Sequence, residues 1–314
     1  MSRFVAIDLA QLPTPDAVVP ASFESIVAQR KADLVARVRV LDADLADEIA
    51  AVLTLESEPL TKDVEAGAYR EVLVYQRINE AVRAVLLPTS GGHDLDNLVS
   101  RLGVKRHVVT PPNAQTGAAA VVEPDEDLRE RYQLALEAFS SAGPYGAYHF
   151  FARSAHPHVK HTAVYGPESE LVDPGQVRVV VLSRIGTGAP TQAVLDAVTA
   201  ALRRDQDVRP LTDDVSVVGA TVTHYSVAYH LHIARGADPN LIVAQSRAAL
   251  EAYTAGRRKV GAAIVLTALD GAAHGDRVNV ERITRTAPGA EVDPGLEGAT
   301  WCDGITITYE IVSD

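Results

Sequence analysis

The chain has 314 residues, of which 47% are hydrophobic, and a formal net charge of −12 at pH 7. This length is enough for two or three cores of ordinary domain size, and the apolar fraction excludes wholesale disorder. The acidic residues are spread along the sequence, so they indicate solubility and exclude a nucleic-acid surface as the main function, because phosphate binding needs a basic face. The single cysteine, Cys302, excludes an intrachain disulfide and a zinc site built from several thiolates. We expect Cys302 to be a small buried hydrophobe beside Trp301.

Residues 1–20 have the composition of an extended arm. Pro13, Pro15 and Pro20 disfavour helix at this density, so we expect the segment to lie across a neighbouring surface. The segment lacks the long apolar core of a signal peptide, and no run in the chain approaches the length of a membrane span. We therefore expect a protein of a reducing compartment that does not insert into a membrane.

Residues 21–108 are predicted to be nearly all helical. Ser22 has the chemistry of an N-cap for a first helix, Asp44 is a candidate start for a second, and a short last helix ends at Gly103. After Pro59, apolar residues recur at helical spacing over about 28 residues, which makes a helix about 40 Å long. Such a helix exceeds the usual globular length and favours a bundle, often with another chain. Its apolar residues are Leu60, Val64, Ala68, Val72, Tyr75, Val82 and Leu86.

The rest of the chain divides into a linker and two domains. Residues 109–139, rich in Pro, Ala and Gly, indicate a linker with a short helix, while residues 140–212 and 213–314 indicate a central and a C-terminal α/β domain. The predicted fold class is α+β, with an N-terminal long-helix bundle segment followed by two small α/β (sheet plus helix) domains. Strands are predicted at 146–154, at 176–183, over a long stretch 216–233 bent near Gly219, at 278–283 and at 305–312. Helices are predicted from Thr191, over 240–254 and over 260–269.

Histidines gather at two places in the sequence. His156, His158 and His161 lie in the segment SAHPHVKH, where neutral imidazoles could bind a divalent metal. No carboxylate accompanies them, so we favour a solvated polar loop. His230 and His232 alternate on one face of a predicted strand, where a pair of metal ligands is the alternative to a hydrated or interfacial strand face.

Catalytic motifs do not emerge from the sequence. It contains no GxSxG nucleophile elbow and no phosphate loop ending in GK[ST]. Glu56 and Glu58 could be read as a catalytic carboxylate pair, but capping of the helix that starts at Pro59 explains these acidic residues more simply. We therefore predict no catalytic residue, no cofactor and no metal site.

Several long segments carry a family resemblance. They are LTLESEPLTKDVEAGAYREVLVYQRINEAVRAVLL followed by GGHDLDNLVSRLGVKR, then FESIVAQRKADL, ALEAFSSAGPYGAYHFFARSA, VVVLSRIGTG and DVRPLTDDVSV. In order and spacing they resemble the baseplate assembly protein J family of contractile-tailed bacteriophages and R-type pyocin particles. The resemblance runs over about residues 7–235, and it includes exposed polar positions of the long helix that helix formation alone would not require.

This resemblance implies a structural, non-enzymatic subunit of the baseplate wedge. Two copies are expected to pair with one I-type tail protein through a shared helical bundle. C-terminal parts, residues 213–314 here, would contact neighbouring wedges, other wedge and sheath-initiating proteins and the central hub. The expected location is the virion tail baseplate, assembled in the bacterial host cytoplasm, with no nucleic-acid partner. The implied bundle seam is Leu60, Val64, Ala68, Val72, Ile78 and Val82, and the implied polar contacts are Tyr69, Arg70, Glu71, Arg77, Asn79 and Glu80.

Two functions of other classes were weighed against the wedge subunit. A metal-dependent or carbohydrate-processing tail enzyme would use the cluster of His156, His158 and His161. A receptor-binding module would show repetitive, fibre-like β sequence, which this chain lacks.

Overall fold

The computed structural model describes residues 7–140, 143–204, 210, 212–275 and 278–312. The chain divides into two compact units, which are residues 7–103 and the residues from 104 onward. The fold class is the predicted α+β, since helices build the first unit and three small sheets with helices build the second. Among the described helices, none is long and apolar enough to cross a membrane.

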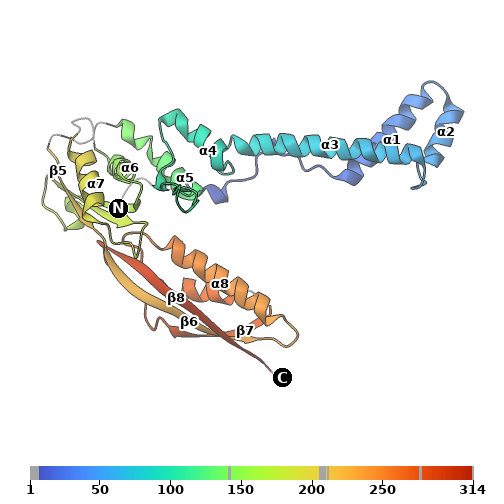
Figure 1. Ribbon diagram of the computed structural model, residues 1–314. Coiled ribbons are helices and arrows are strands. Elements are labelled where there is room, and N and C mark those ends of the chain that lie inside the picture. The colour runs from blue at the N-terminus through green and yellow to red at the C-terminus, as the bar shows by residue number, and fades with distance from the viewer. Residues whose placement is uncertain (1–6, 141–142, 205–209, 211, 276–277, 313–314) are drawn as a thin grey trace. The chain divides into compact units, whose positions relative to one another are not determined.

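Helices make up the first unit (Figure 1). Its α-helices are α1 (Phe23–Arg39), α2 (Ala43–Val52), α3 (Pro59–Ala84) and α4 (Gly92–Val99). The longest, α3, has 26 residues, so the predicted long helix is confirmed and spans about 39 Å.

Capping chemistry explains where these helices begin and end. The Ser22 hydroxyl accepts a hydrogen bond from a backbone N–H of the first turn of α1, as predicted. The second helix is capped by Asp42, so Asp44 lies inside its first turn and is not its start. Pro59 occupies the first helical position of α3, where no N–H is needed. Gly103 ends the short 3-10 turn after α4 with φ of 72°, a left-handed conformation that favours glycine.

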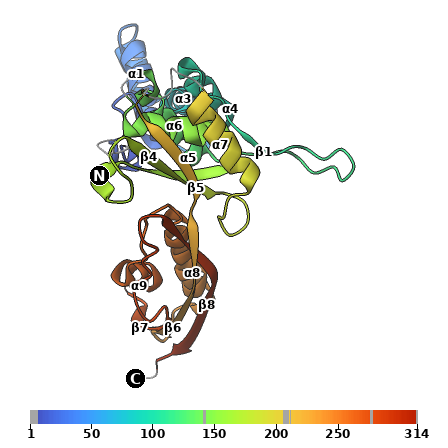
Figure 2. The same ribbon diagram turned by 90° about the vertical axis from the view of Figure 1, so that its left-hand side faces the viewer.

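In the second unit, a small hairpin precedes two sheets. Strands β1 (Val108–Thr110) and β2 (Val121–Val122) pair antiparallel, and Figure 2 shows this hairpin projecting from the rest of its unit. The helix α5 (Asp125–Leu134) follows directly. The segment expected to be a linker thus contains ordered structure on both sides of its loop.

The first sheet has the order β3-β4-β5. Strand β4 (Gln176–Ser183) lies between β3 (Val159–Tyr165), which is antiparallel to it, and β5 (Asp214–Gly219), which is parallel. The helices α6 (Tyr145–Ala155) and α7 (Gln192–Arg204) pack on one face of this sheet. The other face joins Val180 and Leu182 to Val260 and Ala299 of the following part of the unit. Because both faces are covered, β4 is a nearly continuous apolar run.

The second sheet has the order β7-β6-β8. Its long central strand β6 (Thr221–Ile233) is antiparallel to β7 (Val280–Ala287) and parallel to β8 (Gly298–Ile311). The helices α8 (Pro239–Gly256) and α9 (Leu266–His274) cover one face, where alternate residues of β6 are buried. The other face of β6 carries the polar residues that alternate with the buried ones, among them His230 and His232.

Three of the sequence-based element predictions are wrong. Residues 146–154 form the helix α6 and not a strand, because their buried residues Tyr148 and Ala152 recur at the helical spacing of four. The single strand expected over 216–233 is two strands in different sheets, β5 and β6, with Ala220 between them. The helix expected over 260–269 starts only at Leu266, since Ile264 pairs with Val292 as an isolated bridge. Cys302 is half-buried, whereas a buried residue was expected.

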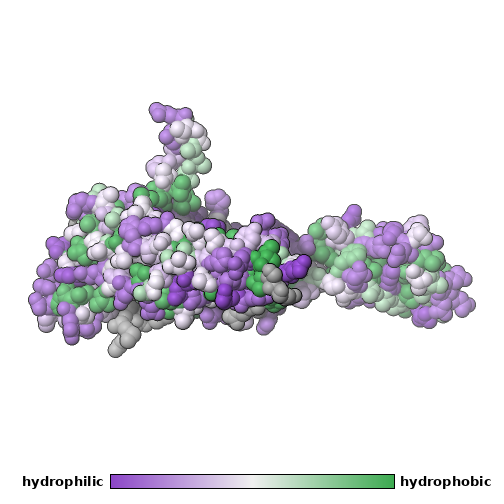
Figure 3. Space-filling model, turned by 90° about the horizontal axis from the view of Figure 1, so that it is seen from below, coloured by the Kyte–Doolittle hydropathy of each residue, from purple (hydrophilic) through white to green (hydrophobic). Residues whose placement is uncertain are grey.

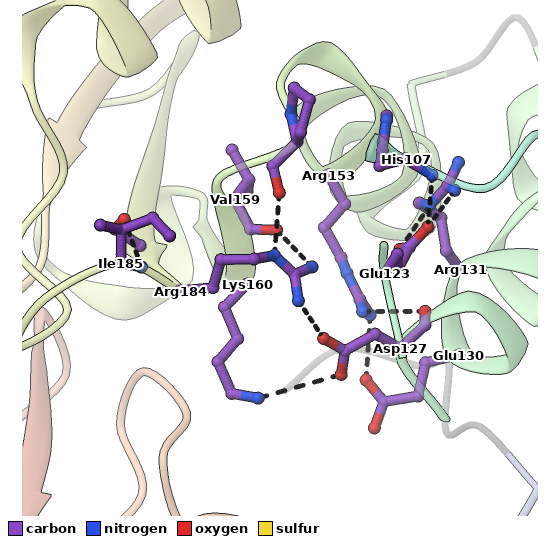
Figure 4. A network of polar contacts seen from close by, with 12 residues as sticks. His107, Glu123, Asp127, Glu130, Arg131, Arg153, Val159, Lys160, Arg184 and Ile185 are labelled. Carbon is purple, nitrogen blue, oxygen red and sulfur yellow. Dashed lines mark hydrogen bonds and ion pairs between the residues drawn. The ribbon is translucent and has the colours of Figure 1, made fainter. Parts of the chain in front are cut away.

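A network of buried ion pairs fixes α5 to the strands and helices around it (Figure 4). The carboxylate of Glu123, just after β2, accepts hydrogen bonds from Nε of Arg131 at 3.1 Å and from Nη2 of Arg131 at 2.6 Å. Both side chains are at most 3% exposed. Burial raises the pKa of Glu123, but the hydrogen bonds and charge of Arg131 outweigh it and leave the pKa below its usual value. Asp127 of α5 pairs with Arg184 through a single contact of 2.5 Å, with both side chains largely buried. The network therefore ties α5 to the segments that flank it on both sides.

Removing one partner of the buried pair is expected to be costly. The change Glu123→Gln should lower the free energy of unfolding by about 3 kcal/mol, because Arg131 is left buried without its counter-charge. Urea unfolding followed by the fluorescence of Trp301, which is the single tryptophan and lies in the same unit, measures this. The control Asp214→Asn removes a carboxylate that is 75% exposed and pairs with Arg203 at 3.6 Å, so it should cost less than about 0.5 kcal/mol. Equal effects of the two variants would contradict the role assigned to the buried pair.

Candidate assembly interface

One side of α3, which carries Val64, Ala68 and Val72, faces α1 of the same chain. Val64 and Ala68 are buried, and Ala68 packs with Ile26 and Val27 of α1. Val72 is partly buried against the same cluster. This side of the predicted seam is therefore occupied by the intrachain core.

The other predicted seam residues have different surroundings. Leu60 and Val82 are half-buried, whereas Ile78 is 50% exposed. The six residues therefore do not form one uniform surface on the helix.

Two of the predicted polar contacts are made within the chain. Glu71 Oε2 pairs with Nη1 of Arg30 on α1 at 3.0 Å. The amide of Asn79 donates to the carbonyl of Val19 at 2.8 Å and accepts from its N–H at 3.1 Å. Asn79 therefore holds the end of the N-terminal arm along α3, so here the arm lies across its own chain.

The remaining predicted polar residues face solvent. Tyr69 is 58% exposed, and Arg70 is exposed as well. Arg77 and Glu80 form an ion pair with an N–O distance of 3.4 Å, with side chains 82% and 63% exposed. An exposed pair of this kind contributes little stability, so both charges remain accessible to a partner.

The guanidinium of Arg30 passes over α3 at Gly67. A Cβ at this position would lie 2.6 Å from Nη2 of Arg30. Glycine therefore leaves room for the guanidinium to reach Glu71 in its present position.

A second apolar stripe, on α3 and its C-cap residue Val85, is not covered by any described part of the chain. Val74, Ile78 and Val85 are 57%, 50% and 62% exposed, and Ala81 between them is exposed too. Their spacing of four, three and four residues is that of a seam between two helices. We call Val74, Ile78, Ala81 and Val85 the outer stripe.

The whole first unit exposes more apolar side chains than the rest of the chain. Of the 25 exposed large hydrophobic residues in the described part, 13 lie in residues 7–103, which are less than a third of the sequence. Figure 3 shows such apolar residues spread over the surface of this unit, at the right of the view. An excess of exposed apolar side chains in one unit favours contact with another chain.

Sequence reasoning named Ile78 for the seam but missed Val74, Ala81 and Val85. Their seam spacing is readable in the sequence, but it competes with the stripe of Val64, Ala68 and Val72, which the same helix also carries. The structure separates the two by showing that α1 covers only one of them.

The histidines proposed as an enzymatic cluster are occupied by structural contacts. The rings of His156 and His158 lie 4.8 Å apart, and Nδ1 of His156 accepts the N–H of His158 at 3.0 Å. Nε2 of His158 lies 3.2 Å from the carbonyl of Val109, which can only accept a hydrogen bond. His161 points elsewhere, since its Nδ1 accepts the N–H of Val260 at 3.2 Å. The three rings do not converge on one point.

His161 and His149 line a pocket of about 340 Å³ together with charged residues. Burial, together with the charge of Arg153, lowers the pKa of His149 to about 4. Burial is also the main cause that brings the pKa of His161 well below its usual value. Both rings are therefore neutral at pH 7, and this fits the hydrogen bond that His161 accepts.

Comparison with known proteins gives matches over nearly the whole chain. The model of the Baseplate J-like N-terminal domain matches residues 56–113, and that of the Baseplate J-like central domain matches residues 140–219. The chain is also 38% identical over 298 residues to "Baseplate protein J" of Escherichia phage P2, covering 94% of this chain and 95% of that protein. The first of these matched regions contains α3 and its outer stripe.

The contact of the arm with Asn79 can be tested by hydrogen exchange. The change Asn79→Ala removes both hydrogen bonds to Val19, so the Val19 amide should exchange roughly thirtyfold faster, because the two bonds together contribute about 2 kcal/mol. The control Gln76→Ala alters an exposed residue of the same helix and should leave this rate unchanged. Unchanged exchange in the Asn79 variant would show that other contacts hold the arm.

The buried histidines predict a loss of stability in mild acid. Between pH 6.5 and about 4, His149 binds a proton in the unfolded chain but stays neutral in the folded one, so lowering the pH favours unfolding. His149 alone should lower the free energy of unfolding by about 3 kcal/mol at pH 4 and should have no effect above pH 7. Urea unfolding of the wild type and of His149→Gln from pH 7.5 to 4.5 measures this, with exposed His224→Gln as control. A pH slope as steep in His149→Gln as in the wild type would contradict it.

Proposed function

The chain belongs to the baseplate J family of phage structural proteins, and we propose that it is a wedge subunit of a contractile tail baseplate. Two copies pair with one I-type tail protein, and the C-terminal parts link wedges into a ring around the central hub. The other partners are further wedge proteins and sheath-initiating proteins. Assembly takes place in the host cytoplasm before the particle carries the protein in its tail baseplate.

The outer stripe is the observation that supports this proposal most directly. Val74, Ile78 and Val85 are each at least half exposed and lie on one side of a helix that is already packed on its other side. Covering a half-exposed Val or Ile gains on the order of 1 kcal/mol, so a seam of several residues offsets part of the cost of association. A partner helix with the same apolar spacing fits this surface.

Charged residues beside the stripe supply selectivity. Arg70 precedes Val74 by four residues and therefore lies on the same side of α3. Arg77 is 82% exposed next to Ile78. Positive charges flanking an apolar seam favour a partner with acidic residues at the matching positions and fix its register.

A wedge with two copies and a single partner places those copies in non-equivalent surroundings. One copy covers its outer stripe with the I-type protein and the other with the first copy. We therefore expect the two copies to differ in conformation, with the differences in the helical unit of residues 7–103.

Co-expression with the I-type tail protein tests the proposal. The two proteins should purify as one complex whose native mass corresponds to two copies of this chain and one of its partner. The double change Val74→Asp and Ile78→Asp should weaken this complex at least tenfold, because it buries two carboxylates in the seam. Arg70→Glu with Arg77→Glu should also weaken it while leaving the chain folded by circular dichroism.

A matched control separates loss of the seam from the added charge. Gln76→Asp introduces a carboxylate at an exposed position of α3 away from the outer stripe, and should leave the complex intact. A well-behaved monomer without affinity for the I-type protein would overturn the proposal. Equal weakening by Gln76→Asp would overturn the assignment of the outer stripe.

A further inference from the structure

The polar face of the β7-β6-β8 sheet brings together two histidines and a carboxylate. His230 and His232 alternate along β6, on the face opposite to the one covered by α8 and α9. The parallel register places Glu310 of β8 directly beside His232. Residues opposed in register project to the same face of a sheet, so the three side chains meet above β6.

The ligand atoms of these three side chains lie close together. Nδ1 of His232 lies 2.6 Å from Oε1 of Glu310, and Nε2 of His230 lies 3.7 Å from Oε2 of the same carboxylate. One ligand atom from each residue lies within 4.8 Å of the others. Ligand atoms in a tetrahedral zinc site are about 3.3 Å apart, so side-chain movements below about 2 Å bring the three into place.

We propose that His230, His232 and Glu310 bind a zinc ion, with water as the fourth ligand. Two imidazoles and one carboxylate form a ligand set that Zn²⁺ takes readily, and a site with three protein ligands keeps one position open. In the described part of the chain, this is the group of three His, Cys, Asp or Glu residues whose ligand atoms lie close enough to bind one ion jointly.

Threonine hydroxyls contact both rings on the side away from Glu310, and for His230 they fix which nitrogen carries the proton. Nδ1 of His230 contacts Oγ1 of Thr308 at 2.8 Å, and Nε2 of His232 contacts Oγ1 of Thr284 at 3.2 Å. The Thr308 hydroxyl donates to the carbonyl of Tyr229 at 3.4 Å, so it accepts the proton of His230 Nδ1. The lone pair of His230 Nε2 is therefore left facing Glu310. Such orientation by hydrogen bonds outside the ligand set is typical of metal-binding histidines.

One neighbouring charge opposes a cation at this place. Nη2 of Arg282 on β7 lies 3.0 Å from Nε2 and 3.4 Å from Nδ1 of His232. Arg282 can only donate, so Nε2 of His232 accepts and Nδ1 carries its proton toward Glu310. Arg282 is exposed, so its side chain can turn into solvent when the ion binds, and the proton of His232 then moves to Nε2 beside Thr284. This cost limits the affinity, and the change Arg282→Ala is expected to tighten zinc binding severalfold.

Zinc binding is measured on the full, untagged chain after removal of metal with a chelator. Equilibrium dialysis against ZnCl₂ with elemental analysis should give one bound ion per chain. His232→Ala and Glu310→Gln should each weaken binding at least tenfold. The matched control His224→Ala removes a histidine of the same strand that contacts Asp303 of β8 at 2.7 Å, and should change nothing.

Spectroscopy on the wild-type chain gives a readout that does not depend on how the variants fold. Co²⁺ in this site should show the intense visible absorption of tetrahedral coordination, and excess Zn²⁺ should abolish it. Glu310 is an exposed residue near the end of β8, so Glu310→Gln should keep its Trp301 fluorescence and unfolding curve in chelator. Substoichiometric zinc, only weak octahedral cobalt absorption, or equal loss of binding in His224→Ala would each show a hydrogen-bonded His–Glu–His cluster and overturn the proposal.

Discussion

The length of α3 sets the main constraint on the helical unit. Its 26 residues span about 39 Å, whereas α1 has 17 residues and spans about 26 Å. The neighbour therefore covers only part of α3, and it does so on the side of Val64, Ala68 and Val72. The outer stripe of Val74, Ile78, Ala81 and Val85 remains exposed. A helix with a second, uncovered apolar side favours a further neighbour, and membership of a family of baseplate proteins implies association with other baseplate components.

The second unit is held by a different kind of interaction. Glu123 and Arg131 are both buried, and Asp127 pairs with Arg184 across the same helix. Buried ion pairs add little net stability compared with apolar contacts, but they penalise any arrangement in which one partner is left alone. They therefore specify one position of α5 between the β1–β2 hairpin and the first sheet.

The sequence predicted what depends on local chemistry and long periodicity. The α+β class, the long helix after Pro59, the cap at Ser22 and the glycine end at Gly103 were all foreseen from residue types at fixed positions. Residues 146–154 were assigned wrongly because nine residues fit both periods, and packing against the sheet selects the helix. Glu310 could not be joined to His230 and His232 in advance, since strand register is a tertiary property. Likewise, only the position of α1 reveals which stripe of α3 is left uncovered.

Intrachain contacts along α3 also decide which polar residues are left for a partner. Glu71 is occupied by Arg30, and Asn79 is occupied by the backbone of Val19, whereas Arg77 remains exposed beside the outer stripe. The arm and α1 thus occupy one side of the helix and leave the other side to recognition. A partner that binds the uncovered side binds only the folded unit, because the stripe exists only when α3 is helical. Its binding therefore stabilises that fold by mass action. The proposed assembly through the outer stripe would therefore couple binding to the folding of residues 7–103.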